Sequence, residues 1–212
     1  MIFYCLGWFL LRYLFQKVVS LSESGEMTGF VFGVYTSWLT SCELLGYATE
    51  VDILTVASAY YLMDIFWLFQ YPAIMNQTLM FLMHHILTLI LLTMIHWYPE
   101  GQGMFYVFFL LAEITNPIQQ SFALWKRHYT PSVTWQYQVF VVLSTCYTFL
   151  YITIRVVTWP ALVYLWTTTG KFAQFPLEIA RISQLVFVLL ICGSYIWSYR
   201  LARGWVKLVS FM

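Results

Sequence analysis

The sequence predicts an all-α membrane protein, a single domain over residues 1–212 with about seven transmembrane helices. Of the 212 residues, 61% are hydrophobic and only 9% are charged, whereas a soluble domain usually carries about 25% charged residues. The apolar residues also come in long runs, and a spanning helix needs about 20 mostly apolar residues. These runs cannot all face water, and no segment between them is long enough for a second, soluble domain.

Seven apolar runs, each bounded by charge, Pro or Gly, mark the expected spans. They cover roughly residues 2–18, 28–46, 53–71, 79–97, 103–123, 137–158 and 177–199. The first run is the weakest, because Arg12 lies in its inner half and Lys17 ends it. We expect both of these side chains to reach toward one membrane surface.

The distribution of Lys and Arg predicts an external or lumenal N-terminus and a cytosolic C-terminus, since short cytosolic loops are rich in these residues. In this orientation the cytosolic segments hold Lys17, Lys126, Arg127, Arg200, Arg203 and Lys207. Only Lys171 then lies in an outer loop, and an odd number of spans is required. The formal net charge of +1 excludes a broad basic face, so nucleic acid is not an expected partner.

Three successive spans carry ionisable residues at a similar depth. Asp64 lies near the inner end of the third span, His84 and His85 near the inner start of the fourth, and Glu113 in the inner half of the fifth. An ionisable side chain in hydrocarbon normally faces a cavity or a partner, and successive helices are usually neighbours. These four residues are therefore expected around one interior site, as candidate catalytic groups.

Other polar residues fall on the same faces. Thr88 is four residues from His84 and shares its face, whereas adjacent His84 and His85 diverge by about 100°. This divergence argues against one metal ion bound by both, so no metal is expected. Tyr61 lies three residues before Asp64 and is placed to hydrogen-bond it.

The fifth span carries a polar stripe made of Glu113, Asn116 and Gln120. Pro117 has no N–H to continue the helical hydrogen bonds, which predicts a kink beside a polar cavity. The alternative interpretation of these polar groups is that they only hold helices together.

A second polar group is expected near the outer side. Arg155 comes late in the sixth span, and Glu178 and Arg181 open the seventh. One interpretation is a local ion pair between Glu178 and Arg181, three residues apart. The other is that Arg155 or Arg181 lines the far end of the cavity and meets a polar lipid group.

The order of these motifs resembles a known family. Asp64 within "YYLMDIFW", then "FLMHHILT", then "FLLAEITNP" are similar to the TLC domain of ceramide synthases, a translocon-associated membrane protein and a neuronal ceroid lipofuscinosis protein. The resemblance covers about residues 12–200 and is closest to the small TLC-domain-containing proteins. It implies a helical barrel of six or seven spans around a long, narrow lipid cavity.

The resemblance also implies a chemistry for the histidine pair. His84 and His85 match the catalytic pair of ceramide synthases, which transfer a fatty acyl group from CoA to the amine of a sphingoid base. Acyl-CoA would then be a cosubstrate, with no bound cofactor. The chain departs from the synthase motif, because Ala112 replaces a His, Glu113 the first Asp and Asn116 the second.

Three functions follow as hypotheses. The first is a protein of lipid homeostasis (sphingolipid, ceramide or phospholipid) that holds a long-chain membrane lipid in the cavity. The second is an acyl-CoA-dependent acyltransferase using His84 or His85, and the third is a seven-span transporter or receptor. The resemblance points to the endoplasmic reticulum or a related endomembrane, and the sequence leaves self-association into a homo-oligomer open.

Overall fold

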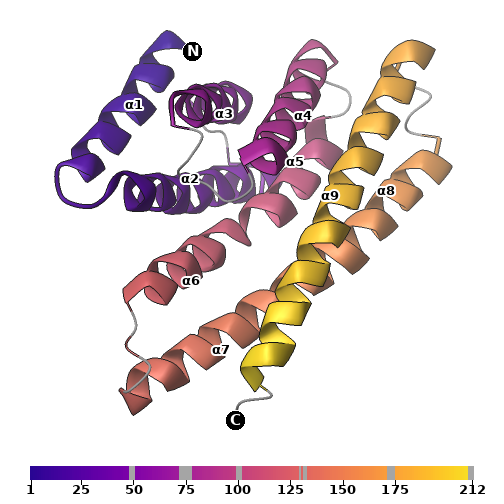
Figure 1. Ribbon diagram of the computed structural model, residues 1–212. Coiled ribbons are helices and arrows are strands. Elements are labelled where there is room, and N and C mark those ends of the chain that lie inside the picture. Colours follow the sequence, from indigo (N-terminus) through magenta and orange to yellow (C-terminus); the bar gives the residue numbers. More distant parts are fainter. Residues whose placement is uncertain are drawn as a thin grey trace.

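The computed structural model describes residues 1–47, 51–71, 78–98, 102–128, 130, 133–170 and 175–209, and the regular structure in these ranges is entirely helical (Figure 1). The helices are α1 Ile2–Gln16, α2 Leu21–Leu44, α3 Ile53–Gln70, α4 Thr78–Trp97, α5 Gln102–Glu113, α6 Asn116–His128, α7 Thr134–Tyr151, η3 Ile152–Thr158, α8 Trp159–Thr168 and α9 Leu177–Val209. The predicted all-α membrane fold is confirmed.

The helices follow the seven predicted spans, with differences in length and continuity. Within the described ranges, four helices are long and apolar enough to cross a membrane. They are Ile53–Gln70, Leu79–Trp97, Thr134–Thr168 and Leu177–Leu208. The sixth span is longer than predicted, because α7, η3 and α8 form one continuous rod. The chain is therefore an integral membrane protein.

The kink predicted at Pro117 is a full break in the helix. α5 ends at Glu113, two residues form a turn, and α6 begins at Asn116. At this turn the Ala112 carbonyl accepts a hydrogen bond from the Thr115 hydroxyl at 2.8 Å. The break divides the fifth predicted span into two shorter helices.

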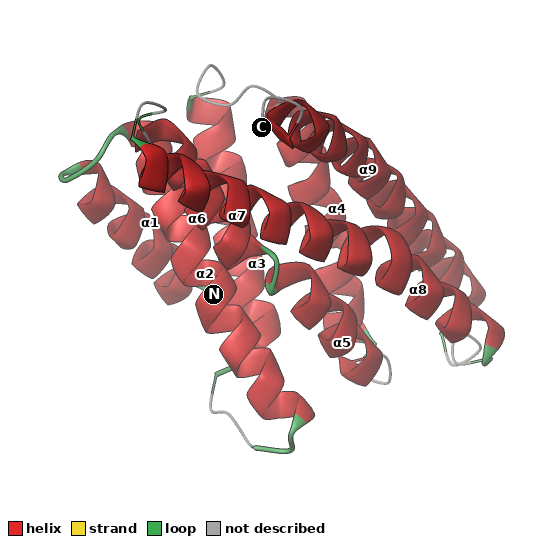
Figure 2. Ribbon diagram, turned by 90° about the horizontal axis from the view of Figure 1, so that it is seen from below, coloured by secondary structure: helices red, strands yellow, loops and turns green. Residues whose placement is uncertain are grey.

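α3 lies at the centre of the helices from the first half of the chain. Figure 1 shows it nearly end-on, and it packs against α1, α2 and α4. Its neighbours contribute an aromatic core, in which Phe32 stacks on Tyr60 with ring centroids 3.7 Å apart and Trp8 meets both rings edge-on. On the other side of the molecule α9 packs along the α7–η3–α8 rod (Figure 2).

α2 approaches its neighbours closely through three glycines on one face. A Cβ at Gly25 would lie 2.8 Å from the Arg12 guanidinium, and one at Gly33 would lie 2.9 Å from the Pro117 ring. Gly29 faces Gln120 in the same way, at 3.0 Å. Small residues at four-residue spacing are typical of close helix contacts in membranes. Because these three glycines have no side chain, α6 and the Arg12 guanidinium can pack directly against α2.

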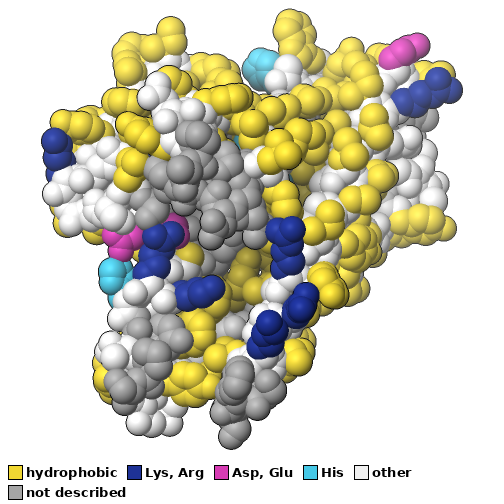
Figure 3. All heavy atoms as spheres, in the orientation of Figure 1, with side chains coloured by type: hydrophobic (Ala, Val, Ile, Leu, Met, Phe, Trp, Pro, Cys, Tyr) yellow, Lys and Arg dark blue, Asp and Glu magenta, His cyan; other side chains and the backbone are white. Residues whose placement is uncertain are grey.

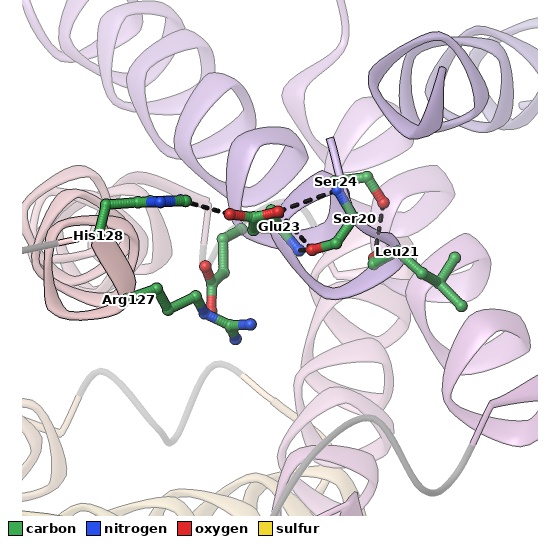
Figure 4. A network of polar contacts seen from close by, with 7 residues as sticks. Ser20, Leu21, Glu23, Ser24, Arg127 and His128 are labelled. Carbon is green, nitrogen blue, oxygen red and sulfur yellow. Dashed lines mark hydrogen bonds and ion pairs between the residues drawn. The ribbon is translucent and has the colours of Figure 1, made fainter. Parts of the chain in front are cut away.

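A polar network joins the start of α2 to the end of α6 (Figure 4). Ser20 and Glu23 form a capping box, with the Ser20 backbone N–H donating to Glu23 Oε2 at 2.9 Å. Glu23 also contacts His128, and Arg127 donates to Glu26 Oε1 at 2.6 Å. Hydrogen bonds from the Ser20 hydroxyl and backbone, followed by the His128 contact, lower the pKa of Glu23 to about 2.

Most of the basic side chains lie toward one end of the molecule. Figure 3 shows an extensive apolar surface, on which most Lys and Arg lie in the middle and lower part of the view and others at its upper right and left edges. The last turns of both α6 and α9, which lie in the lower half of Figure 1, carry basic residues, Lys126 and Arg127 on α6 and Lys207 on α9. This end is the one predicted to face the cytosol.

Candidate functional site

A cavity of about 300 Å³ lies among α2, α3, α4, α6, η3 and α9. Its walls differ in polarity, because α4 and α9 contribute mainly apolar side chains whereas α3, α6 and η3 contribute polar ones. Leu79 and Met83 of α4, with Leu189 and Ile196 of α9, line the cavity and are also exposed on the surface. The cavity therefore reaches the surface beside α4 and α9, where lipid tails would lie.

Asp64 forms a buried ion pair that the sequence did not predict. Arg12 Nη1 donates to Asp64 Oδ1 at 2.6 Å, and both side chains are at least nine-tenths buried. The Arg12 guanidinium also lies over the Trp67 ring, 4.8 Å from its centroid. The expectation that Arg12 reaches toward a membrane surface is wrong, because the Asp64 carboxylate on α3 and the space left by Gly25 hold it inside.

His85 lies on the other side of the same carboxylate. Its Nδ1 is 3.3 Å from Asp64 Oδ2, within electrostatic contact but not aligned as a hydrogen bond. The ring is buried and lies 5.0 Å from the Tyr61 ring. Asp64 thus links α1, α3 and α4.

His84 has a different environment. It lines the cavity together with His85, and the two rings are 5.6 Å apart and tilted by 54°. Its nearest aromatic neighbour on α9 is Trp197, at 6.2 Å between ring centroids. Thr88, expected on the same face as His84, donates its hydroxyl to the backbone carbonyl of His84 at 2.8 Å, so this hydrogen bond goes to the helix and not to the imidazole.

Glu113 is held by two neighbours. The Tyr61 hydroxyl donates to its Oε1 at 2.7 Å, and Asn116 Nδ2 donates to its Oε2 at 2.6 Å across the break between α5 and α6. Tyr61 was expected to bond Asp64, and this expectation is wrong. Gln120, one turn beyond Asn116, lines the main cavity as well. Glu113 itself borders a smaller void of about 20 Å³, which also touches Tyr61 and Thr88.

Arg155 is not at the outer side, where the sequence analysis placed it. It lies in the π-helix η3, in the interior of the long α7–η3–α8 rod, and lines both the main cavity and the smaller void. Its Nη2 donates to the Ala112 carbonyl at 2.8 Å, beside the α5–α6 break. The longer rod explains the error, because the span continues about ten residues beyond its predicted end.

Arg181, the other arginine expected near the outer side, lies away from the site. Arg181 and Glu178 are both exposed near the start of α9, and neither lines the cavity. Among the described residues no ion pair joins them within 4.0 Å, so the predicted local pair is also wrong. Sequence reasoning further missed Trp197 and Gly193 of α9 as cavity residues; an unbroken apolar run gives no signal for either.

Comparison with known proteins identifies the family. Residues 2–203 match the family model of the TLC domain, which extends the predicted region of about residues 12–200 to the start of α1. No curated protein and no solved structure shows significant similarity to the chain. The match covers nearly the whole sequence, from the first helix through most of α9. The chain thus belongs to the TLC domain family of membrane proteins.

Proposed function

We propose that the protein holds a long-chain lipid in the cavity among α3, α4, α6, η3 and α9, and acts in sphingolipid, ceramide or phospholipid homeostasis. The observation that carries the proposal is the polarity of the cavity. Its apolar wall reaches the surface beside α4 and α9, its polar wall presents Asn116 and Arg155, and His84 and His85 add polar groups on α4. A lipid has the same division between chain and headgroup. Ligand pockets are typically of about 300–1,000 Å³ and mostly apolar with a few placed polar groups.

The proposed setting is the endoplasmic reticulum or a related endomembrane, with a lumenal N-terminus and a cytosolic C-terminus. The basic last turns of α6 and α9 support this orientation. The motif departures at Ala112, Glu113 and Asn116 support a place among the small TLC-domain-containing proteins, outside the synthases.

A pair of glycine substitutions on α9 tests lipid binding in this cavity. Gly193 lines the cavity, whereas Gly204 does not, and a Cβ at either position meets no atom within 4 Å. Leu at either position should therefore leave the helix intact, and replacing Gly favours helix by up to about 1 kcal/mol. Only Gly193→Leu places a side chain in the cavity.

The measurement is the amount of lipid that co-purifies in mild detergent, determined by mass spectrometry of the extract. Wild type and Gly204→Leu should retain a stoichiometric lipid, and Gly193→Leu should lose it. Equal retention by both variants would show that the lipid lies elsewhere.

A second candidate function is an acyl-CoA-dependent acyltransferase, favoured by two histidines on one cavity wall with Asp64 beside His85. A neutral imidazole is a good nucleophile near pH 7. His84 would attack the thioester carbonyl, the C–S bond would break, and CoA would leave as the thiol with the imidazole proton. An amine or hydroxyl of the acceptor would then take the acyl group and return a proton to the ring.

Release of free CoA tests this second function. The purified protein is incubated with a panel of acyl-CoAs, with and without a sphingoid base, and its intact mass is followed. Turnover should disappear in His84→Ala and persist in His96→Ala, a control on the exposed outer end of α4. If wild type releases no CoA, the acyltransferase function is refuted and lipid holding is the proposal that stands.

A further inference from the structure

Arg155 is a buried cation that no carboxylate of the described residues contacts directly. The residue is 5% exposed, and within the described ranges no carboxylate lies within 4.0 Å of its guanidinium. One nitrogen donates to the Ala112 carbonyl, and the guanidinium lies 5.0 Å from the centroid of the Trp159 ring. Its Nε is buried and has no hydrogen-bond partner in the described structure.

The acidic residues nearby are already engaged. Glu113 accepts from Tyr61 with one oxygen and from Asn116 with the other. Asp64 is paired with Arg12 through one oxygen, and its other oxygen lies against His85. Both carboxylates therefore have nearer partners than Arg155, although Glu113 and Arg155 line the same small void and interact electrostatically across it.

The backbone around Arg155 is unusual. Seven residues, Ile152–Thr158, form a π-helix within an otherwise α-helical rod, and π-helical segments occur often at functional sites. Within this segment Arg155 lines the same cavity as His84 of α4. A charged side chain in the membrane interior is costly, and it usually marks a ligand or ion pathway.

We infer that Arg155 binds the anionic end of the lipid, a carboxylate or a phosphate, while the chain lies along the apolar side chains of α4 and α9. This inference rests on the proposed lipid-holding function and narrows the ligand to lipids with an acidic headgroup. A planar guanidinium suits both anions, because its N–H groups match two oxygens at once.

Lipids with the same chain and different headgroups test the inference. Binding to the delipidated protein in detergent is measured at neutral pH for tritiated palmitate against hexadecanol, and for monopalmitoyl glycerol phosphate against monopalmitoyl glycerol. One or both anions should bind about tenfold or more tightly than the neutral match, the factor expected for hydrogen bonds to an ionised group. The anion preferred in these two pairs distinguishes a carboxylate from a phosphate ligand.

Variants then assign the preference to Arg155. Arg155→Gln should bind neutral and anionic members equally, Arg155→Lys should keep part of the preference, and the exposed Arg181→Gln should keep all of it. Equal binding of both members by wild type, or an undiminished preference in Arg155→Gln, would overturn the inference. The wild-type comparison decides even where Arg155→Gln does not fold. Failure of every lipid to bind would instead refute the proposed function.

Discussion

Removing the Asp64 carboxylate alone should destabilise the protein far more than removing both members of its ion pair. The test compares Asp64→Leu, Arg12→Met and the double variant with wild type. Each single substitution leaves one charge buried between α1 and α3, whereas the double variant replaces the pair with apolar side chains.

The magnitude follows from the geometry of the pair. The two charged groups are 2.6 Å apart, with 6% and 10% of their side chains exposed. Breaking such a buried pair on one side costs about 3–5 kcal/mol, whereas replacing both partners with apolar residues of similar size is often neutral or stabilising by about 1–4 kcal/mol. The contact of the Arg12 guanidinium with the Trp67 ring contributes less than the ion pair, because a cation over an aromatic ring is worth about 0.5–2 kcal/mol.

The assay is reversible unfolding of the four proteins in one detergent or bicelle. We expect each single variant to lose about 3–5 kcal/mol in the free energy of unfolding, and the double variant to return close to wild type. A double variant that loses the sum of both single losses would refute the argument. An Asp64→Leu protein as stable as wild type would do so as well.

Two further predictions concern α2. Gly33→Ala places a Cβ 2.9 Å from the Pro117 ring and should lower the melting temperature, whereas Gly7→Ala, with no atom within 4 Å of its Cβ, should not; equal melting temperatures would contradict the close packing of α2 on α6. Since the pKa of Glu23 is lowered from 4.5 to about 2, its stabilising effect is complete above about pH 4.5 and is lost as the pH falls through 2. Unfolding measured across this range should therefore depend less on pH in Glu23→Gln than in wild type, and identical profiles would contradict the capping geometry.

Hydropathy predicted the helices well because apolar runs of fixed length are what a bilayer requires. Hydropathy predicted less about which side chains contact each other. Arg12 was expected to reach the membrane surface because its position near the end of a run allows that, and only the packing of α1 on α3 shows the Asp64 carboxylate beside it. The GxxxG spacing at Gly25 and Gly29 is visible in the sequence but does not say which helix it meets.

The sequence predicted only part of the candidate site, because it gives the depth of a residue in the membrane but not which side chains it contacts. Depth along each helix placed Asp64 and His85 at one level, and the structure brings them to 3.3 Å. The sequence could not predict the π-helix around Arg155, because no residue type specifies the wider turn. It also could not predict that Tyr61 donates to Glu113 rather than to Asp64. Such choices depend on helix rotation, which tertiary packing sets.

The most direct test is photocrosslinking in reconstituted membranes with a long-chain lipid that carries a diazirine in the middle of its chain. If the cavity holds the lipid, adducts mapped by peptide mass spectrometry should fall on cavity residues such as Met83 and Trp197. They should also be lost in Gly193→Leu and kept in Gly204→Leu. Adducts confined to outward-facing side chains away from the cavity, such as Phe149, and unchanged in Gly193→Leu would contradict the proposed function.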